Sequence, residues 1–289
     1  MSRPEPATKR DRLLAAFPEL HDHGKPALLL HPHLAAPSPK DSSVGGPLLW
    51  PSDEPWPTCP HGHYVFEAPA ENGDVYYDEP LFLQPVLQLF ARDLPAGHTF
   101  PESADLLQVL WCPNDHPEPP EAFRHHYGPS LVVRWRFAAD ITKAFDEQPR
   151  PHTVTSYYER LPACGLSIEA VDDYPSVFDL PEELAHLIDE DSEEEEGDNA
   201  IPVGSTAIPR FAYVDHIGAR EGMKFGGYPS YGPTDPFLMT CECGAELEHL
   251  LQIDSPETGP LDLALGRGHV LCVYRCPRST RHPHRINLQ

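Results

Sequence analysis

The chain has 289 residues, of which 40% are hydrophobic and 23% charged, and its formal net charge is −24. This length provides a sizeable core in one large domain or two small ones. Nucleic acid is excluded as a natural partner, because phosphate contacts need clusters of Lys and Arg. A basic peptide or protein suits such a surface better. The 36 prolines predict short strands, many turns and few short helices.

The predicted compartment is the cytoplasm. No apolar run reaches the ~18–20 residues that a membrane span needs, so we expect no membrane association. The stretch MSRPEPATKRDRLLAAF lacks the apolar segment and cleavage site of a signal peptide. Seven cysteines are an odd number, which fits reduced thiols or metal ligands better than a disulfide framework.

The predicted elements begin with an N-terminal helical segment, residues 1–24, containing an amphipathic helix over 8–17. A first strand-rich unit follows at 25–171. Its strands are expected at 27–34, 81–90, 105–112 and 131–137. The last of these alternates apolar and polar residues, with one face predicted to be buried. That face carries Leu131, Val133, Trp135 and Phe137.

Residues 172–200 are expected to form an acidic helix and a flexible linker. A helix over 178–191 would begin at Asp179 as N-cap, with Glu182 three residues later. Residues 172–198 hold thirteen Asp and Glu and no Lys or Arg, and such a run is typically solvated and mobile. A second strand-rich unit, 201–289, contains a strand at 270–276, and we expect one compact domain overall.

The two units resemble each other in sequence. SVGGPLLWPSDEPWPTCPHG in the first corresponds to KFGGYPSYGPTDPFLMTCECG in the second, and VLQLFARDLP corresponds to LLQIDSPETG. The interval from Gln88 to Cys112 is 24 residues, and the interval from Gln252 to Cys276 is again 24. Several features recurring in one order indicate an internal duplication.

Each unit brings a turn with closely spaced Cys and His and, later, a strand ending in Cys-Pro. Zinc accepts thiolate and imidazole ligands tetrahedrally, and four protein ligands make a closed structural site. The first unit offers Cys59, His61 or His63, Cys112 and His116; the second offers Cys241, Cys243, Cys276 and His282. The alternative is that Cys59, Cys112 and Cys276 are small buried hydrophobic residues, which is the role expected for Cys164 and Cys272.

Two further pairs recur in the units. Gly45-Gly46 and Gly226-Gly227 are interpreted as structural turns that need positive φ or close backbone approach. Gln88 and Gln252 lie in apolar strands, where a buried amide must be hydrogen-bonded. Bonding to the backbone of the same unit is favoured for both over contact with a ligand.

No catalytic motif stands out. The sequence has no H-E-x-x-H, no G-x-S-x-G and no H-x-E followed by P-C-x-x-C. A catalytic zinc normally keeps an open coordination position, whereas four candidates per unit favour closed sites. A non-enzymatic function is therefore preferred.

The motifs S-x-GG-P-x-x-W-P, L-x-L-F-x-x-D-L-P, LLQVLWCP and, in the second unit, K-x-GG-x-P with LLQID resemble the YwqG-like family, a bacterial domain of unknown function, over roughly residues 25–285. The resemblance implies an α+β fold of two intertwined, duplicated strand-rich units. It also implies a distant similarity to programmed-cell-death-2-like proteins, which act as chaperones for a ribosomal protein. The family brings no catalytic residues, and CPHGH and CEC depart from its zinc-bearing pattern.

The leading hypothesis is a cytoplasmic protein that binds a protein or peptide, possibly a basic one, and uses zinc structurally. Two alternatives stay open. One is a metal-dependent hydrolase with an incomplete site at Cys59, His63 and Cys112. The other is an immunity protein against a neighbouring toxin, with the acidic segment 172–198 covering a basic surface.

Overall fold

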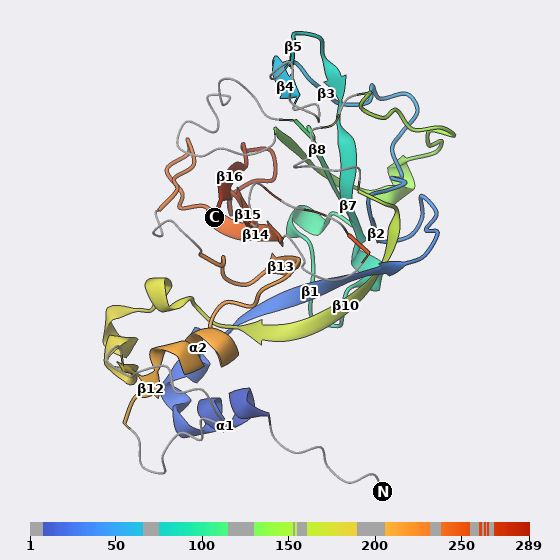
Figure 1. Cartoon of the computed structure of the whole chain (residues 1–289). Helices are drawn as coiled ribbons and strands as arrows, with labels where there is room; N and C mark the ends of the chain where they lie inside the picture. Colours follow the sequence, from blue (N-terminus) through green and yellow to red (C-terminus); the bar gives the residue numbers. More distant parts are fainter. Residues whose placement is uncertain are drawn as a thin grey trace, which may run out of the picture.

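The computed structural model describes residues 8–65, 75–114, 130–152, 154, 161–189, 206–231, 238–254, 260–261, 263, 265 and 269–289. Its main feature is a curled ten-stranded sheet with the order β16-β15-β14-β13-β1-β10-β2-β7-β8-β9 (Figure 1). All neighbouring strands in it are antiparallel. The predicted strand-rich architecture with short helices is confirmed.

The strands of this sheet are β1 (Lys25–Leu34), β2 (Ser43–Val44), β7 (Gln84–Phe90), β8 (Leu106–Trp111), β9 (Leu131–Arg136), β10 (Cys164–Asp173), β13 (Lys224–Gly226), β14 (Glu248–Ile253), β15 (Leu271–Arg275) and β16 (Arg285–Leu288). Three two-stranded sheets pair β3 (Thr58–Cys59) with β6 (Leu81–Phe82), β4 (His63–Val65) with β5 (Val75–Tyr77), and β11 (Ile188–Asp189) with β12 (Ile208–Pro209). The α-helices are α1 (Lys9–Ala16) and α2 (Arg210–His216). The 3-10 helices are η1 (Pro18–His23), η3 (Ala91–Asp93), η4 (Pro101–Ser103), η6 (Ala138–Asp140), η7 (Val177–Asp179) and η8 (Glu182–Leu187).

The long strands β1 and β10 form the centre of the sheet. They pair over ten residues, from Lys25 opposite Asp173 to Leu34 opposite Cys164. Strand β2 follows on the β10 side and β13 on the β1 side. From the centre outward the order is β2-β7-β8-β9 on one side and β13-β14-β15-β16 on the other. The two halves of the sheet therefore meet at a shared central pair.

Apolar residues from both halves fill one main core. Leu28, Val86 and Leu107 from the first half pack in the same buried cluster as Leu251 and Val273 from the second. Burial of this apolar surface is the main stabilising term of such a fold. The two halves are thus held by a common hydrophobic core.

A second buried cluster joins the helices. Leu13, Leu20 and Tyr213 are fully buried in it, and in Figure 1 α1 and α2 lie together, away from β3, β4 and β5. Helix α1 begins as predicted near residue 8, because Thr8 and Asp11 form a reciprocal capping box. In the described residues, no helix combines the length and apolar character needed to cross a membrane.

Three of the predicted first-unit strands form close to their expected bounds, as β1, β8 and β9. The expected strand 81–90 is divided, because β6 pairs with β3 whereas β7 enters the large sheet. The predicted burial of Phe137 is wrong: its side chain is 48% exposed. Phe137 follows the end of β9, so the strand alternation no longer determines which way it points.

The predicted helix over 178–191 is also wrong. The chain forms η7 and η8, separated by Leu180 and Pro181, and then enters β11. Proline disfavours the α conformation of the residue before it, which prevents a continuous helix here. Asp179 is the last residue of η7 and not an N-cap. Residues 172–189 are structured, whereas 190–200 lie outside the described residues.

Candidate metal centres

Four Cys and His side chains converge where β15 ends. The ligand atoms of Cys241, Cys243, Cys276 and His282 all lie within 4.8 Å of one another. The Sγ atoms of Cys243 and Cys276 are 3.6 Å apart. The Nδ1 atom of His282 lies 3.2 Å from Sγ of Cys276 and 3.6 Å from Sγ of Cys241. We call these four residues the second cluster, and they could hold a metal ion.

A tight turn brings Cys241 and Cys243 to this point. The Cys241 carbonyl accepts the N–H of Gly244 at 2.8 Å, and the Cys241 N–H donates to the carbonyl of Ala245 at 2.8 Å. Gly244 has a φ of +79°, a conformation that side chains disfavour. Cys276 follows β15 directly. The second cluster therefore joins a glycine turn to a strand end.

The surroundings of Cys276 favour its metal-binding form. Burial alone would raise the pKa of this thiol, but hydrogen bonds involving His282, the backbone of Arg278 and the thiols of Cys243 and Cys241 lower the pKa to about 6. A thiolate is the species that ligates a metal. The geometry and the ionisation state of Cys276 thus point to the same use.

Three side chains converge in the first half. The ligand atoms of Cys59 on β3, His63 on β4 and Cys112 after β8 lie within 4.8 Å of one another. All three are buried, and the two cysteines pack among Trp50 and Trp56. Contact with Cys59, and then burial, raises the pKa of Cys112. A metal at this first cluster would have to displace the thiol protons in an apolar environment.

The other predicted candidates are distributed as follows. His61 belongs to neither group of converging ligand atoms in the described part of the chain. His116 lies outside the described residues. Cys164 and Cys272 are fully buried among apolar side chains. Burial raises the pKa of Cys272 to about 12, so this thiol is protonated and acts as a core residue.

The two glycine pairs have the left-handed backbone that only glycine adopts readily. The φ angles of Gly45, Gly46, Gly226 and Gly227 are +72°, +86°, +76° and +68°. A Cβ atom on Gly45 would come within 2.1 Å of the Pro162 carbonyl oxygen. Gly45-Gly46 directly follows β2, whereas Gly226 is the last residue of β13 and Gly227 follows it.

Gln88 and Gln252 are fully buried and bind backbone groups. Gln88 accepts from the N–H of Leu49 at 2.7 Å and donates to the carbonyls of Pro39 and Asp41 at 3.0 Å each. Gln252 accepts from the N–H of Ser230 at 3.0 Å and donates to the carbonyls of Arg220 and Gly222 at 3.3 and 2.9 Å. Each amide therefore fixes the segments on both sides of an inner strand.

Sequence reasoning missed a buried ion pair beside the central strands. Lys224 Nζ lies 2.8 Å from Asp173 Oδ2, and both side chains are 0% exposed. Asp173 also accepts the N–H groups of Arg220 and Tyr228 at 2.7 and 2.8 Å. Burial lowers the pKa of Lys224, and Asp173 opposes this shift. The sequence signal for this ion pair was Lys224 itself, a lysine directly before Phe225-Gly226 in a short apolar strand.

No protein-family model matches the chain. A search of curated proteins likewise finds no related sequence.

Proposed function

We propose that this chain is a non-enzymatic protein- or peptide-binding protein in which zinc at the Cys/His clusters fastens turns to strand ends. The observation that carries the proposal is the convergence of Cys241, Cys243, Cys276 and His282 within 4.8 Å. Thiolate and imidazole ligands are the usual ligands of structural zinc. The role of the metal would be to hold loops that contain little regular structure.

The dimensions of the second cluster support zinc. With Zn–S bonds of about 2.3 Å and tetrahedral angles, two sulfur ligands are about 3.8 Å apart. The Cys243–Cys276 separation of 3.6 Å differs little from this value. Small side-chain adjustments would complete a Cys3His site, and the low pKa of Cys276 would favour metal uptake.

A duplicated YwqG-like fold is part of the proposal, and matched contacts in the two halves support it. Gln88 binds backbone groups of Pro39, Asp41 and Leu49, which lie four and two residues before Ser43 and six residues after it. Gln252 binds backbone groups of Arg220, Gly222 and Ser230, which lie at the same three distances in sequence from Lys224. Each glutamine pairs with that same strand residue. Strand register also shifts between Pro85 and Leu87, and at the corresponding place in β14.

The binding role is proposed from the family resemblance and the net charge of −24. An acidic surface attracts basic partners and accelerates their association. Affinity purification from native lysate at low and high salt tests this role. A stoichiometric partner that dissociates at high salt is expected, and the lack of any stoichiometric partner under both conditions would contradict it.

Metal content is tested separately, by elemental analysis of untagged protein purified without chelator. We expect zinc in wild-type protein and about one zinc less per chain in Cys243→Ser. Cys272→Ser is the matched control, because Cys272 is buried outside both clusters. Zinc content that is unchanged in Cys243→Ser would contradict the assignment.

One observation favours a second candidate, a metal-dependent hydrolase at the first cluster. In the part of the chain that the structure describes, this cluster has three ligands and not four. Three protein ligands and a water are typical of catalytic zinc. Ester or peptide hydrolysis lost in Cys59→Ser and kept in Cys243→Ser would support this alternative, whereas equal activity in both variants would exclude it.

A further inference from the structure

Two cysteines of the second cluster lie near the distance at which a disulfide bond forms. The Sγ atoms of Cys243 and Cys276 are 3.6 Å apart. A disulfide bond is about 2.05 Å long, so the two sulfur atoms must approach by about 1.5 Å. Neither cysteine is in a disulfide bond in the structure. The pair is therefore available for oxidation.

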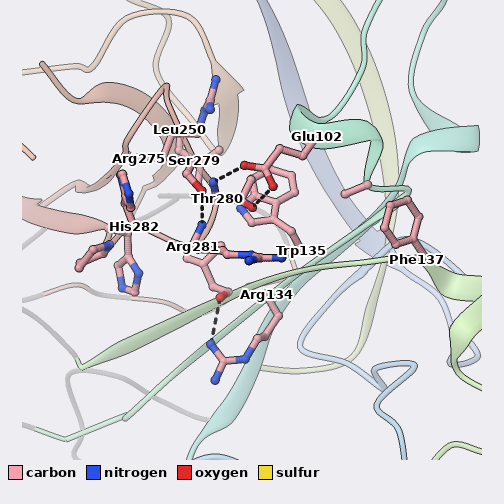
Figure 2. A pocket seen from close by; sticks show the side chains of 14 residues that line it. Glu102, Arg134, Trp135, Phe137, Leu250, Arg275, Ser279, Thr280, Arg281 and His282 are labelled. Carbon is pink, nitrogen blue, oxygen red and sulfur yellow. Dashed lines mark hydrogen bonds between the residues drawn. The ribbon is translucent and has the colours of Figure 1, made fainter. Parts of the chain in front are cut away.

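The backbone on both sides of this sulfur pair is held by contacts that involve no metal. Arg278 donates a hydrogen bond to the Cys243 carbonyl at 2.8 Å, which joins the glycine turn to the segment after Cys276. Figure 2 shows how this segment continues. The carboxylate of Glu102 accepts the N–H and the hydroxyl of Thr280 at 2.8 and 2.9 Å. These contacts keep the two sulfur atoms near each other when no ion holds them.

Solvent reaches Cys243 more easily than the other two thiols of the cluster. Cys241 and Cys276 are only 7% and 1% exposed, whereas Cys243 is half-buried. A Cβ atom on the adjacent Gly244 would meet no atom within 4 Å, so the turn beside Cys243 faces open space. An accessible thiol next to a second thiol is the usual arrangement of redox-sensing cysteines.

The first cluster lacks this access. Cys59 and Cys112 are 1% and 0% exposed, and Trp50 and Trp56 pack in the same cluster. Thiols that are buried among apolar side chains are inert, because oxidation follows exposure and thiolate character. Oxidation of the metal-binding thiols is therefore expected to begin in the second half.

We propose that the second cluster is a redox switch, in which a peroxide oxidises Cys243 and Cys276 to a disulfide and the metal is released. The inference rests on the proposed metal-binding function and adds regulation of the same site. Cys241 and His282 would then be the remaining ligands, and two ligands do not make the four-coordinate site of a structural zinc. The disulfide replaces the metal as the link between the glycine turn and the end of β15.

The reaction needs one peroxide for each disulfide. The sulfur of Cys243 attacks a peroxide oxygen, the O–O bond breaks, and Cys243 becomes a sulfenic acid. The sulfur of Cys276 then attacks the sulfur of Cys243, so that the S–S bond forms and the S–O bond breaks. Two electrons pass from sulfur to the peroxide. Two protons, from the thiols or from solvent when zinc is bound, complete the conversion of hydrogen peroxide to two water molecules.

The test is treatment of the full-length protein, as purified, with hydrogen peroxide, followed by alkylation in denaturant, trypsin digestion and mass spectrometry. Trypsin separates the cysteines, because Cys276 lies in the peptide 276–278 and Cys243 in the peptide 225–267. We expect these two peptides to be linked, with Cys243 assigned by fragmentation. About one zinc per chain should be released in parallel, as measured with a chromogenic chelator. Dithiothreitol and added zinc should reverse both changes.

Three variants separate the disulfide from the metal. Cys241→Ser removes a proposed zinc ligand but keeps the reacting pair, so the link should still form. Cys243→Ser should not form it. Cys272→Ser is the matched control and should behave as wild type, because Cys272 is fully buried outside both clusters. Wild-type protein that forms the link but contains no zinc would contradict the proposed function and support the thiol pairing.

The rate of alkylation loss gives the comparison between the clusters. Cys243 should be oxidised at least about tenfold faster than Cys59 or Cys112. Absence of the link between 225–267 and 276–278, or a Cys241–Cys243 disulfide in its place, would overturn the proposal. Zinc that stays bound after complete linking, or equal rates in the two clusters, would overturn it as well.

Discussion

One Cys/His cluster lies in each half of the large sheet, and the two clusters differ in their surroundings. The second cluster has four ligands at a partly exposed turn and a thiol whose pKa is lowered to about 6. The first has three ligands within a tryptophan-rich core and a thiol whose pKa is raised. The comparison teaches that two groups of Cys and His with similar spacing in the chain can have different surroundings: the second is suited to hold a metal ion, whereas apolar packing surrounds the first.

The largest expected effect comes from the second cluster. Cys243→Ser removes one ligand of four, so zinc should be lost and the melting temperature should fall by about 10 °C, since metal affinity contributes directly to folding. Chelation of wild-type protein should reproduce most of this change. Cys59→Ser should cost less, because Trp50, Trp56 and Leu110 support the first cluster. Equal melting temperatures for Cys243→Ser and wild type would remove the difference between the halves.

The buried ion pair provides the next comparison, because Lys224 pairs with Gln252 across the sheet and Ser43 pairs with Gln88. Lys224→Met leaves the Asp173 carboxylate buried without its counter-ion and should lower the free energy of unfolding by about 3–5 kcal/mol. Ser43→Ala should change it by less than about 1 kcal/mol. Urea unfolding measures both. A Lys224→Met effect as small as that of Ser43→Ala would show that the ion pair is not important for stability.

The buried glutamines test whether the halves are built alike. Gln88→Leu and Gln252→Leu should each cost about 2–3 kcal/mol, because each removes three hydrogen bonds from a buried amide to part-buried backbone groups. Gln88→Leu should cost slightly more, since Gln88 also accepts from Gln108 Nε2 at 2.9 Å. Thermal unfolding of the two variants side by side gives the comparison. A large effect in one half and none in the other would argue against equivalent roles.

The smallest predicted effect is the change in the free energy of unfolding for each pH unit. We expect the second half to lose stability as the pH falls. Burial lowers the pKa of His249 to about 3 and that of His284 to about 4. Both values lie below the ordinary pKa of about 6.5, so the unfolded state binds more protons and stability falls as pH drops from 6.5 towards 4. The expected slope is about 1.4 kcal/mol per pH unit for each histidine.

Hydrogen exchange at pH 7 and pH 5 checks this prediction by region. Amides of β14 and β16 should lose protection at pH 5 before those of β7, because the register shift of β7 begins at Pro85, which does not titrate, whereas that of β14 begins at His249. His249→Phe is the control. Without this histidine, the number of protons taken up on unfolding should fall by one. Equal loss of protection in both halves would contradict the assignment to these histidines.

Much of the sheet could be predicted because its strands carry continuous or alternating apolar residues. β1, β8, β9 and β15 all have this signal. Strand β10 was missed, because its sequence CGLSIEAVDD contains acidic residues that extend into the acidic run. Its pairing with β1, and the satisfaction of Asp173 by Lys224, depend on residues far away in sequence. Local composition therefore did not indicate that residues 172–173 continue β10 or that the helical turns of 177–187 are two 3-10 helices.

The candidate site was predictable for a different reason. Cys241, Cys243 and Cys276 stand out by spacing and by their counterparts in the first unit, so convergence could be anticipated without a structure. His61 and His63 could not be separated by sequence, since both lie in one proline- and glycine-rich turn. The structure groups His63 with Cys59 and Cys112.

Zinc-edge X-ray absorption of the Cys59→Ser variant tests the central claim most directly, because the remaining signal comes from the second cluster. The account predicts one zinc per chain bound by three sulfur atoms at about 2.3 Å and one imidazole nitrogen at about 2.0 Å. In the double variant Cys59→Ser/His282→Ala, the imidazole nitrogen should disappear from the zinc shell. The Zn–S distance should stay the same. A protein without zinc, or a zinc shell made mainly of oxygen and nitrogen, would contradict the claim that Cys241, Cys243, Cys276 and His282 form a closed structural metal site.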